Sequence, residues 1–404
     1  MSRVSAVDLE PVFDSRGQPT VEATVVLSSG ARGTAGAPSG ASTGRHEARA
    51  FPAEGVPGAL RAFRERLRPK LLGVEGDLAT FDLVLRESDR TPDFSEVGGN
   101  TATALSIAAA LALAVESHRP LWRLLARPGV DGRVFPAIVG NCLNGGRHAI
   151  GGPDIQEFHA VARAPDPERS VRAALRVHAL VGEALRSRQP GAPLGRGDEG
   201  GWVSGIGNVE AFEVLRAACD RARDELGVDV RPGVDFAASE FFRDGRYRYR
   251  EQTLDTEGQR RFVEELVERF GLVFVEDPFE QESLDAFAEL TKSVGDRTTI
   301  VGDDVYVTQA ERLRRGIERH ASNAILVKVN QVGTLTATLE TVDLARKHGI
   351  ATVTSHRSGD LPEGWLAHVA LASAAWGLKC GLLGGERVAK LNELLRLGRA
   401  TSVA

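Results

Sequence analysis

The stretch LVFVEDPF at residues 272–279 decides how the chain folds. It is a short run of β-branched and aromatic residues, which is typical of a strand covered on both faces. Pro278 cannot donate a ladder hydrogen bond, so the strand has to end before it. Glu276 and Asp277 are therefore expected at the C-terminal tip of a buried strand.

Similar apolar runs that end in polar residues lie on either side of this stretch. Their tips fall at Asp235, Asp303, Lys328, His356 and Lys379, and neighbouring tips are 23 to 41 residues apart. Most of these steps suit one strand and one returning helix, which is the repeat of a parallel (β/α) barrel. The predicted fold class is α/β, and the side chains at the tips are expected to meet at one end of the barrel.

The size, net charge and cysteine content of the chain indicate its number of domains and argue against several classes of partner. A chain of 404 residues exceeds what one hydrophobic core usually supports, so two domains are expected. The net charge is −5 and the arginines lie among acids on expected helices, which argues against nucleic acid or a membrane as a partner. The apolar run 104–115 is too short to span a bilayer. Three cysteines without C-x-x-C spacing indicate neither a disulfide framework nor a zinc site and favour the cytoplasm.

A change of pattern near residue 130 separates the two expected domains. Residues 3–37 alternate in the manner of an antiparallel meander, and residues 59–117 have helical periodicity. The sequence thus predicts an α+β capping domain over residues 1–130 and a barrel over residues 131–404. The segment 37–44, which contains Ser39, is rich in glycine and hydroxyl groups and is predicted to be a mobile loop that reaches over the barrel.

The residue types at the strand tips suggest a metal and a base. Asp235, Glu276 and Asp303 are hard oxygen donors, which favour Mg²⁺, or Mn²⁺ in its place, over zinc. An isolated acid at a strand end is more often a helix cap or an ion-pair partner. Only six of the 50 basic residues are lysine, and two of them, Lys328 and Lys379, fall at tips. Unlike a guanidinium, a lysine can lose its proton and act as a base. A lysine beside a divalent cation suits the removal of a weakly acidic proton next to a carboxylate, so a metal-assisted lyase or isomerase is predicted.

The motifs around these residues resemble those of the enolase (phosphopyruvate hydratase) family from about residue 8 to residue 397. The matching segments are DSRG (14–17), PSGASTG (38–44), LNGG (143–146), QEF (156–158), GDEGG (197–201), SEFF (239–242), EDPF (276–279), LVKVNQ (326–331), SHRSG (355–359) and AKLN (389–392). The resemblance implies an enolase-type barrel with an N-terminal capping domain, a hydro-lyase that acts on 2-phosphoglycerate, and a homodimer.

The resemblance also implies a role for each matched residue. Asp235, Glu276 and Asp303 would hold a tightly bound Mg²⁺, and Ser39 would close over a second Mg²⁺ that arrives with the substrate. Lys328 would be the base at C2 of the substrate, and Glu199, with Glu157 beside it, would help the C3 hydroxyl leave. The substrate would be lined by His148 and His356, its phosphate held by Arg357 and Ser358, and its carboxylate contacted by Lys379.

Several loops depart from the family pattern, at residues 147–153, 202–205, 360–365 and 380–387, and the segment after Glu47 is shortened. These loops would surround the substrate, whereas the residues that make and break bonds match. That combination also fits a paralogue acting on a phosphonate-modified carboxylate, such as carboxyphosphonoenolpyruvate synthase of phosphonate natural-product pathways. A non-catalytic binding or structural descendant is disfavoured, because it has no need of Lys328 together with three metal acids. Cys380, beside Lys379, is more often a packing residue than a reactive one.

Overall fold

The alternating N-terminal segment forms a three-stranded antiparallel sheet in the computed structural model, which describes residues 2–41, 43–188 and 190–403. One face of the sheet is apolar, and Val21, Ala23 and Val25 on its middle strand are fully buried. The strands are β1 (Val4–Phe13), β2 (Pro19–Leu27) and β3 (Arg32–Gly36). The helical segments that follow are α1 (Gly55–Ala62), a π-helical turn η1 (Phe63–Leu67), α2 (Arg68–Leu71), α3 (Leu78–Ser88), α4 (Gly99–Glu116) and α5 (Leu121–Leu125).

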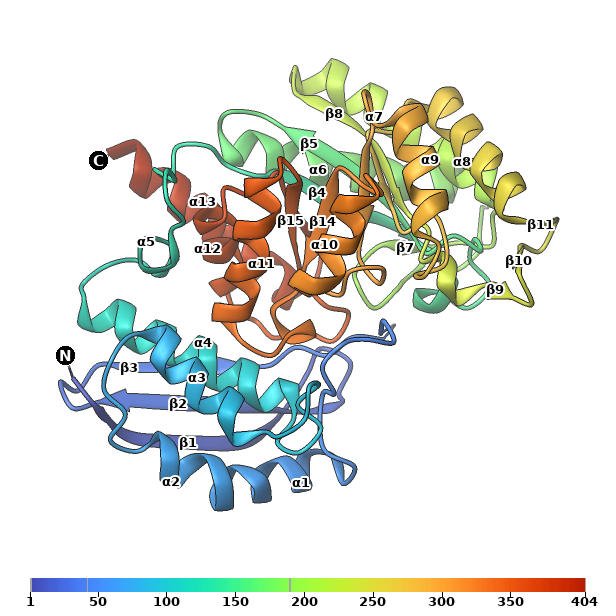
Figure 1. Ribbon diagram of the computed structural model, residues 1–404. Coiled ribbons are helices and arrows are strands. Elements are labelled where there is room, and N and C mark those ends of the chain that lie inside the picture. The colour runs from blue at the N-terminus through green and yellow to red at the C-terminus, as the bar shows by residue number, and fades with distance from the viewer. Residues whose placement is uncertain (1, 42, 189, 404) are drawn as a thin grey trace.

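Helix α4 lies between this sheet and the rest of the molecule, while α1 and α2 lie beside the edge strand β1 (Figure 1). The helix approaches β3 so closely that a Cβ at Gly33 would lie 2.0 Å from the carbonyl oxygen of Ala108. Its hydroxyl groups face the second domain, where Thr103 donates to the carbonyl of Gly333 and Ser106 accepts from the amide of Leu335. Among the described residues, α4 is the one helix long and apolar enough to cross a membrane, and 78% of it is buried inside the protein.

Eight strands close into a barrel in the second domain. Their order around the barrel is β16-β15-β14-β13-β12-β8-β5-β4, and β16 pairs with β4 to complete the circle. The barrel strands are β4 (Ala137–Asn144), β5 (Glu157–Arg163), β8 (Asp229–Asp235), β12 (Phe274–Glu276), β13 (Thr299–Gly302), β14 (Ala324–Val327), β15 (Ala351–Ser355) and β16 (Gly377–Gly381). This confirms the predicted α/β class with a C-terminal barrel.

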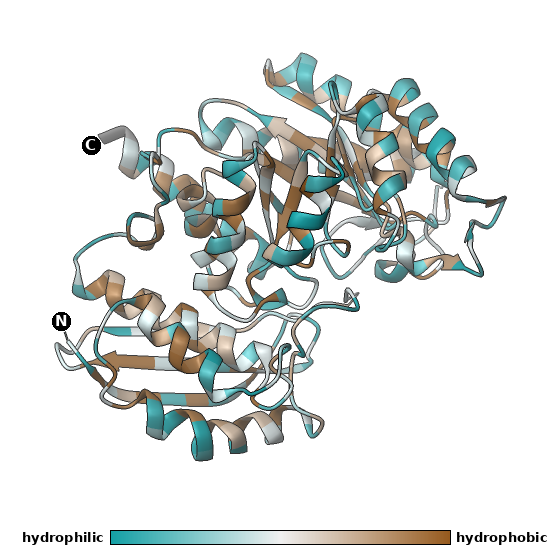
Figure 2. Ribbon diagram, viewed as in Figure 1, coloured by the Kyte–Doolittle hydropathy of each residue, from teal (hydrophilic) through white to brown (hydrophobic). Residues whose placement is uncertain are grey.

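Helices surround the barrel. They are α6 (Pro167–Arg188), α7 (Asn208–Leu226), α8 (Thr256–Phe270), α9 (Leu284–Val294), α10 (Ala310–Glu318), α11 (Leu335–Lys347), α12 (Trp365–Ala372) and α13 (Gly385–Val403). Helices α6 and α7 both lie between β5 and β8, one helix joins each later pair of barrel strands, and α13 follows the last strand. Figure 2 shows hydrophobic residues along the barrel strands and hydrophilic residues on the outward faces of the helices. Short strands β6 (Gly195–Arg196), β7 (Trp202–Val203), β9 (Phe242–Arg243), β10 (Arg246–Arg248) and β11 (Thr253–Leu254) and 3-10 turns η2 (Gly146–His148), η3 (Ala238–Glu240) and η4 (Val329–Gln331) lie in the loops.

The strand repeat predicts a fully parallel barrel, but one strand of the structure runs in the opposite direction. Strand β5 runs antiparallel to both of its neighbours, β4 and β8. The physical reason is the connection from β4 to β5, which holds only the short turn η2 and is too short for the helix that a parallel crossover needs. As a result Glu157, the first residue of β5, lies at the same end of the barrel as Asp235, the last residue of β8, with which it pairs.

The predicted strand tips agree with the structure except at Lys379. Asp235 and Glu276 end their strands and pair with each other, and Asp303, Lys328 and His356 each follow the last residue of a strand. Lys379 lies inside β16, level with Ser355 at the end of β15, so its long side chain has to reach the barrel mouth from within the strand.

A buried carboxylate joins the two domains. Asp82 on α3 accepts a hydrogen bond of 2.9 Å from the backbone amide of Thr336 on α11. Burial raises the pKa of Asp82 from 3.8 to about 6. The native protein therefore binds this proton more tightly than the unfolded chain does, and the contribution of Asp82 to the free energy of unfolding falls as pH rises from 3.8 to about 6.

We expect Asp82→Asn to be more stable than the unmodified protein at pH 7, by up to about 3 kcal/mol, because the variant has no buried charge to desolvate. The advantage should shrink as pH falls toward 4, where the native carboxyl is protonated. Urea unfolding of both proteins between pH 4 and pH 7.5 measures this difference. A difference that does not change with pH would contradict the assignment.

Candidate active site

Most of the residues predicted to act in catalysis line one small cavity of about 20 Å³ at the mouth of the barrel. The wall is almost entirely polar, and the side chains come from the ends of several different strands. The lining residues are Gly40, His148, Gln156, Glu157, Glu199, Asp235, Asp303, Lys328, Ser355, His356, Arg357, Ser358 and Lys379. Two predicted residues, Glu276 and Ser39, are not part of the lining.

Lys379 lies at the centre of a group of buried carboxylates. Its Nζ atom is 3.0 Å from Asp235, 2.7 Å from Glu276 and 3.1 Å from Glu157. Burial alone would lower the pKa of Lys379, but these carboxylates hold it well above its usual range. Glu276 thus belongs to the site although it does not line the cavity. Three carboxylate side chains converge here on a single positive charge.

Lys328 forms an ion pair with Asp303 at the next part of the cavity wall. Burial opposes the charge of Lys328, yet the neighbouring Asp303 carboxylate raises its pKa. The backbone amide of Lys328 donates to the Thr308 hydroxyl at 2.9 Å, and Gln331 donates to the other oxygen of Asp303 at 2.9 Å. The end of β14 and the carboxylate of Asp303 are therefore both fixed by hydrogen bonds with neighbouring residues, and the amine of Lys328 is held beside the acid cluster.

The acid cluster has the chemistry of a cation site. Burial, together with the charge of Asp235, raises the pKa of Glu276 well above its usual value, so the cluster carries more negative charge than it readily accommodates. The ligand atoms of Asp235, Glu276 and Asp303 do not all lie within 4.8 Å of one another. Lys379 binds the first two and Lys328 binds the third, so each of the three carboxylates has an ammonium group as its partner.

Two other groups of three residues among those described bring their ligand atoms within 4.8 Å, namely Asp277 with Asp303 and Asp304, and His148 with Glu157 and Glu199. Asp277 accepts hydrogen bonds from the backbone amides of Asp303 and Asp304, at 2.9 and 2.8 Å. Both of its oxygens are thus in use, and its role is to shape the turn that presents Asp303. The structure therefore contains groups of acids suited to a metal ion, and Asp303 is shared between the predicted set and one of them.

Two glutamates in the cavity wall, Glu157 and Glu199, have pKa values shifted in opposite directions. Burial and the charge of Glu199 raise the pKa of Glu157 well above its usual value. Burial also disfavours the charge of Glu199, but the neighbouring His356 and His148 outweigh it and hold the pKa of Glu199 well below its usual range. Neighbouring titratable groups with diverging pKa values are typical of an acid and base pair.

Arg357 is held from both domains. Its guanidinium donates to Glu47 and to Asn330, each at 2.9 Å, and Glu47 is a residue of the capping domain. The hydroxyl of Ser358 accepts from the backbone amide of Ala41 at 2.6 Å. No sequence pattern indicates a role for Glu47, because its partner lies 310 residues further along the chain. A buried arginine and serine side by side suit an anionic group such as a phosphate.

Ser39 lies apart from the acid cluster. Its backbone forms a two-way bridge with Gly359, with hydrogen bonds of 2.7 and 2.8 Å, and its hydroxyl accepts from Asn100 at 3.1 Å. Among the residues of the predicted loop, Gly40 lines the cavity and residue 42 is outside the described part of the chain.

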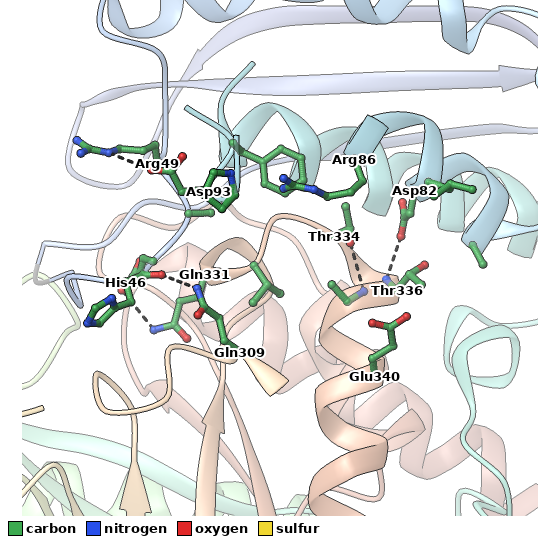
Figure 3. A pocket seen from close by; sticks show the side chains of 18 of the residues that line it. His46, Arg49, Asp82, Arg86, Asp93, Gln309, Gln331, Thr334, Thr336 and Glu340 are labelled. Carbon is green, nitrogen blue, oxygen red and sulfur yellow. Dashed lines mark hydrogen bonds and ion pairs between the residues drawn. The ribbon is translucent and has the colours of Figure 1, made fainter. Parts of the chain in front are cut away.

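A larger cavity of about 880 Å³ lies between the two domains beside the site (Figure 3). Its wall includes His46, Arg49, Asp93, Arg86 and Asp82 from the capping domain and Gln309, Gln331, Thr334, Thr336 and Glu340 from the barrel domain. None of the predicted catalytic residues lines it. Gln331 connects the two cavities, because its amide donates to both Glu47 and Asp303.

A glycine on β16 sets the position of Glu199. A Cβ at Gly381 would lie 2.1 Å from the carbonyl oxygen of Glu199, closer than any real contact. We expect Gly381→Ala to displace the Glu199 backbone and to lower kcat by about a hundredfold, because misplacing a catalytic group by 1 Å has an effect of that size. Gly195→Ala is the control, since nothing lies within 4 Å of a Cβ there. Equal loss of activity in the two variants would contradict this explanation.

Comparison with known proteins supports the motif resemblance over the whole chain. A model of the enolase N-terminal domain matches residues 4–125, and a model of the enolase C-terminal TIM barrel domain matches residues 132–402. A protein from Halorubrum lacusprofundi named enolase is 45% identical over 401 residues, which covers 98% of this chain and 99% of the relative. Relatives of the same name from Methanothermobacter thermautotrophicus and Natronomonas pharaonis are 45% and 44% identical, cover 98% of this chain in each case, and match over 96% and 99% of their own lengths.

Proposed function

Because this chain belongs to the enolase family, we propose that it removes water from 2-phosphoglycerate and forms phosphoenolpyruvate. It is a hydro-lyase of the phosphopyruvate hydratase type. The observation that carries the proposal is one cavity that is lined by Lys328, Glu199 and Glu157 together, with a cluster of buried carboxylates beside them.

The metal that the family implies is Mg²⁺, and the acid cluster fits it. Asp235, Glu276 and Asp303 would hold the ion, since all three are oxygen donors and Lys379 already marks the point where two of them meet a positive charge. When bound, the ion supplies positive charge that stabilises the enolate formed from the substrate. Two ions are proposed, the second bound together with substrate. Ser39 remains the residue proposed to close over it, which requires its bridge to Gly359 to open.

The protein side chains provide the proton transfers. Lys328 would take the proton from C2 of the substrate, which requires its ion pair with Asp303 to loosen so that the amine is neutral. The C3–O bond then breaks, the double bond forms between C2 and C3, and the departing hydroxide takes a proton from the Glu199 and Glu157 pair. The raised pKa of Glu157 supports a protonated carboxyl in this pair at neutral pH.

The remaining residues would bind and orient the substrate. Arg357 and Ser358 would hold the phosphate, with Glu47 and Asn330 fixing the guanidinium plane. Lys379 would contact the carboxylate, and His148 and His356 would line the space near the leaving hydroxyl, since both lie close to Glu199.

The test is direct. Purified protein with Mg²⁺ and 2-phosphoglycerate is followed by the absorbance of the enol product, and steady turnover that stops on addition of a chelator is expected. No turnover in spite of bound metal would overturn the proposal and would favour a phosphonate-modified substrate instead. The near full-length relatives named enolase do not favour that alternative.

We also propose a homodimer in the cytoplasm, and a domain boundary near residue 130, between α5 and β4. Light scattering after size exclusion should give twice the chain mass of 43.3 kDa. Limited proteolysis should cut first between residues 126 and 136. A single-chain mass, or first cuts within either domain, would contradict these expectations.

A further inference from the structure

Arg387, in the first turn of α13, is the largest fully buried side chain among the described residues. Its guanidinium donates to the backbone carbonyls of Arg357 at 2.5 Å, Ser358 at 2.6 Å and Asp198 at 3.0 Å. These three carbonyls come from the two loops that carry the proposed phosphate-binding residues and Glu199. The side chain of Arg387 therefore connects the two loops through hydrogen bonds to their backbones.

The same guanidinium contacts a ring nitrogen of His356. Nη1 of Arg387 lies 2.7 Å from Nδ1 of His356, and the backbone amide of Gly381 donates to the same nitrogen at 3.4 Å. A guanidinium keeps its protons at all ordinary pH values and a backbone amide has no lone pair to offer, so both can only donate. Nδ1 of His356 must therefore accept, and the ring proton must be on Nε2.

The other side of the ring faces Glu199. Nε2 of His356 lies 3.0 Å from Oε2 of Glu199, although its N–H direction is off the straight line of an ideal hydrogen bond. Glu199, Arg387 and Asp360 are the charged groups around this histidine. Burial and Arg387 lower the pKa of His356 to about 4, against the opposing effect of the Glu199 and Asp360 carboxylates. At neutral pH the ring is a neutral group whose proton is on the nitrogen that lies 3.0 Å from Glu199.

We infer that Arg387 is a positioning residue that fixes His356 as the Nε2–H tautomer, so that His356 acts as a hydrogen-bond donor to Glu199 and not as a proton acceptor. The inference deepens the proposed function and rests on it for the catalytic role of Glu199. It also explains how the loop at Asp198 keeps its register with Arg357 and Ser358, because each of them gives a carbonyl to the same guanidinium.

Lys390 offers a matched control on the same helix. It is buried to a similar degree, and its ammonium binds the carbonyls of Leu361 and Glu386, each at 3.0 Å, and a carboxylate oxygen of Asp360 at 3.1 Å. Asp360 is also a partner of Arg387. Removing either cation disturbs the same buried surroundings, but only Arg387 contacts His356.

The experiment measures the tautomer itself, in substrate-free protein labelled with ¹⁵N-histidine. Long-range ¹H–¹⁵N correlations distinguish a ring nitrogen that carries a proton from one that does not, and His356→Gln assigns the signal among the nine histidines. In the unmodified protein and in Lys390→Met, we expect His356 to carry its proton on Nε2 alone. In Arg387→Met, we expect both tautomers and a pKa of His356 above 4.

Kinetics provide the second readout. We expect Arg387→Met to lower kcat by about a hundredfold and added guanidinium ion to restore part of the loss, which a loss of general stability would not allow. If Arg387→Met does not fold, Arg387→Lys keeps the charge and is expected to show the same mixture of tautomers. An Nδ1–H or doubly protonated His356 in the unmodified protein, or an unchanged tautomer in a folded Arg387 variant, would overturn the inference. Failure to turn over 2-phosphoglycerate would overturn the proposed function and leave the tautomer result standing.

Discussion

Replacing Lys328 with alanine is expected to lower kcat for 2-phosphoglycerate by about a thousandfold or more, because a general base of this kind contributes a factor of that size. Lys328 lies at the end of β14 with its amine in the wall of the cavity. Without it, the lysine that remains in the cavity wall is Lys379, whose ammonium group is held by Asp235, Glu276 and Glu157. Exchange of the C2 hydrogen with solvent deuterium, followed by NMR, should be lost together with dehydration.

Two controls separate the loss of the base from the loss of a charge. Lys328→Arg keeps a positive charge beside Asp303, but a guanidinium does not accept a proton, so this variant should be as inactive as the alanine variant. Magnesium affinity measured by calorimetry should not fall, because Lys328 is an ion-pair partner of Asp303 and not a ligand of the metal. A Lys328→Ala enzyme that still exchanges the C2 hydrogen would remove Lys328 from the base role.

Glu199→Gln is expected to lower dehydration by about a thousandfold while leaving exchange at C2 largely intact. Glu199 is buried in the cavity wall, and His356, His148 and Asn141 lie close to its carboxylate. The amide has the same shape but cannot deliver a proton to the leaving hydroxyl. Because Lys328 is untouched, the proton at C2 can still be removed and returned.

The matching variant Glu157→Gln tells which of the two glutamates gives the proton. The raised pKa of Glu157 and the lowered pKa of Glu199 fit an arrangement in which Glu157 holds the proton at neutral pH. A larger loss in Glu157→Gln than in Glu199→Gln would make Glu157 the immediate donor. Loss of C2 exchange in Glu199→Gln would contradict a role confined to the hydroxyl side.

The strand tips could be predicted from the sequence because the barrel repeat leaves a simple pattern. A buried strand such as Phe274–Glu276 is a short apolar run, and the residue that ends it must point into the loop region at the barrel mouth. The sequence alone therefore predicts the positions of Asp235, Glu276 and Asp303. The residues proposed for the base and for the metal site can be recognised as polar residues at the ends of apolar runs.

Other features could not be read from the pattern because they depend on contacts between distant segments. Glu47 meets Arg357, and Arg387 meets His356, through side chains whose partners no local periodicity reveals. The reversed direction of β5 has a signal in the sequence, namely the connection between residues 145 and 156, which is too short for a crossover helix. The bridge between Ser39 and Gly359 likewise forms across domains, so the glycine-rich composition of the loop could not locate it.

The pairing of β16 with β4, which closes the barrel, has a consequence for how the chain folds during synthesis. Residues 377–381 of β16 pair with residues 137–141 of β4, whereas β4 and β5 form a hairpin between near neighbours in sequence. The hairpin can form early, because closing a short loop loses little chain entropy. The pairing of β16 with β4 cannot form until β16 has left the ribosome. Until then β4 presents an unpaired apolar edge, which can pair with other chains. Nascent chains that stall before residue 377 should therefore depend on chaperones, while those released beyond it should not.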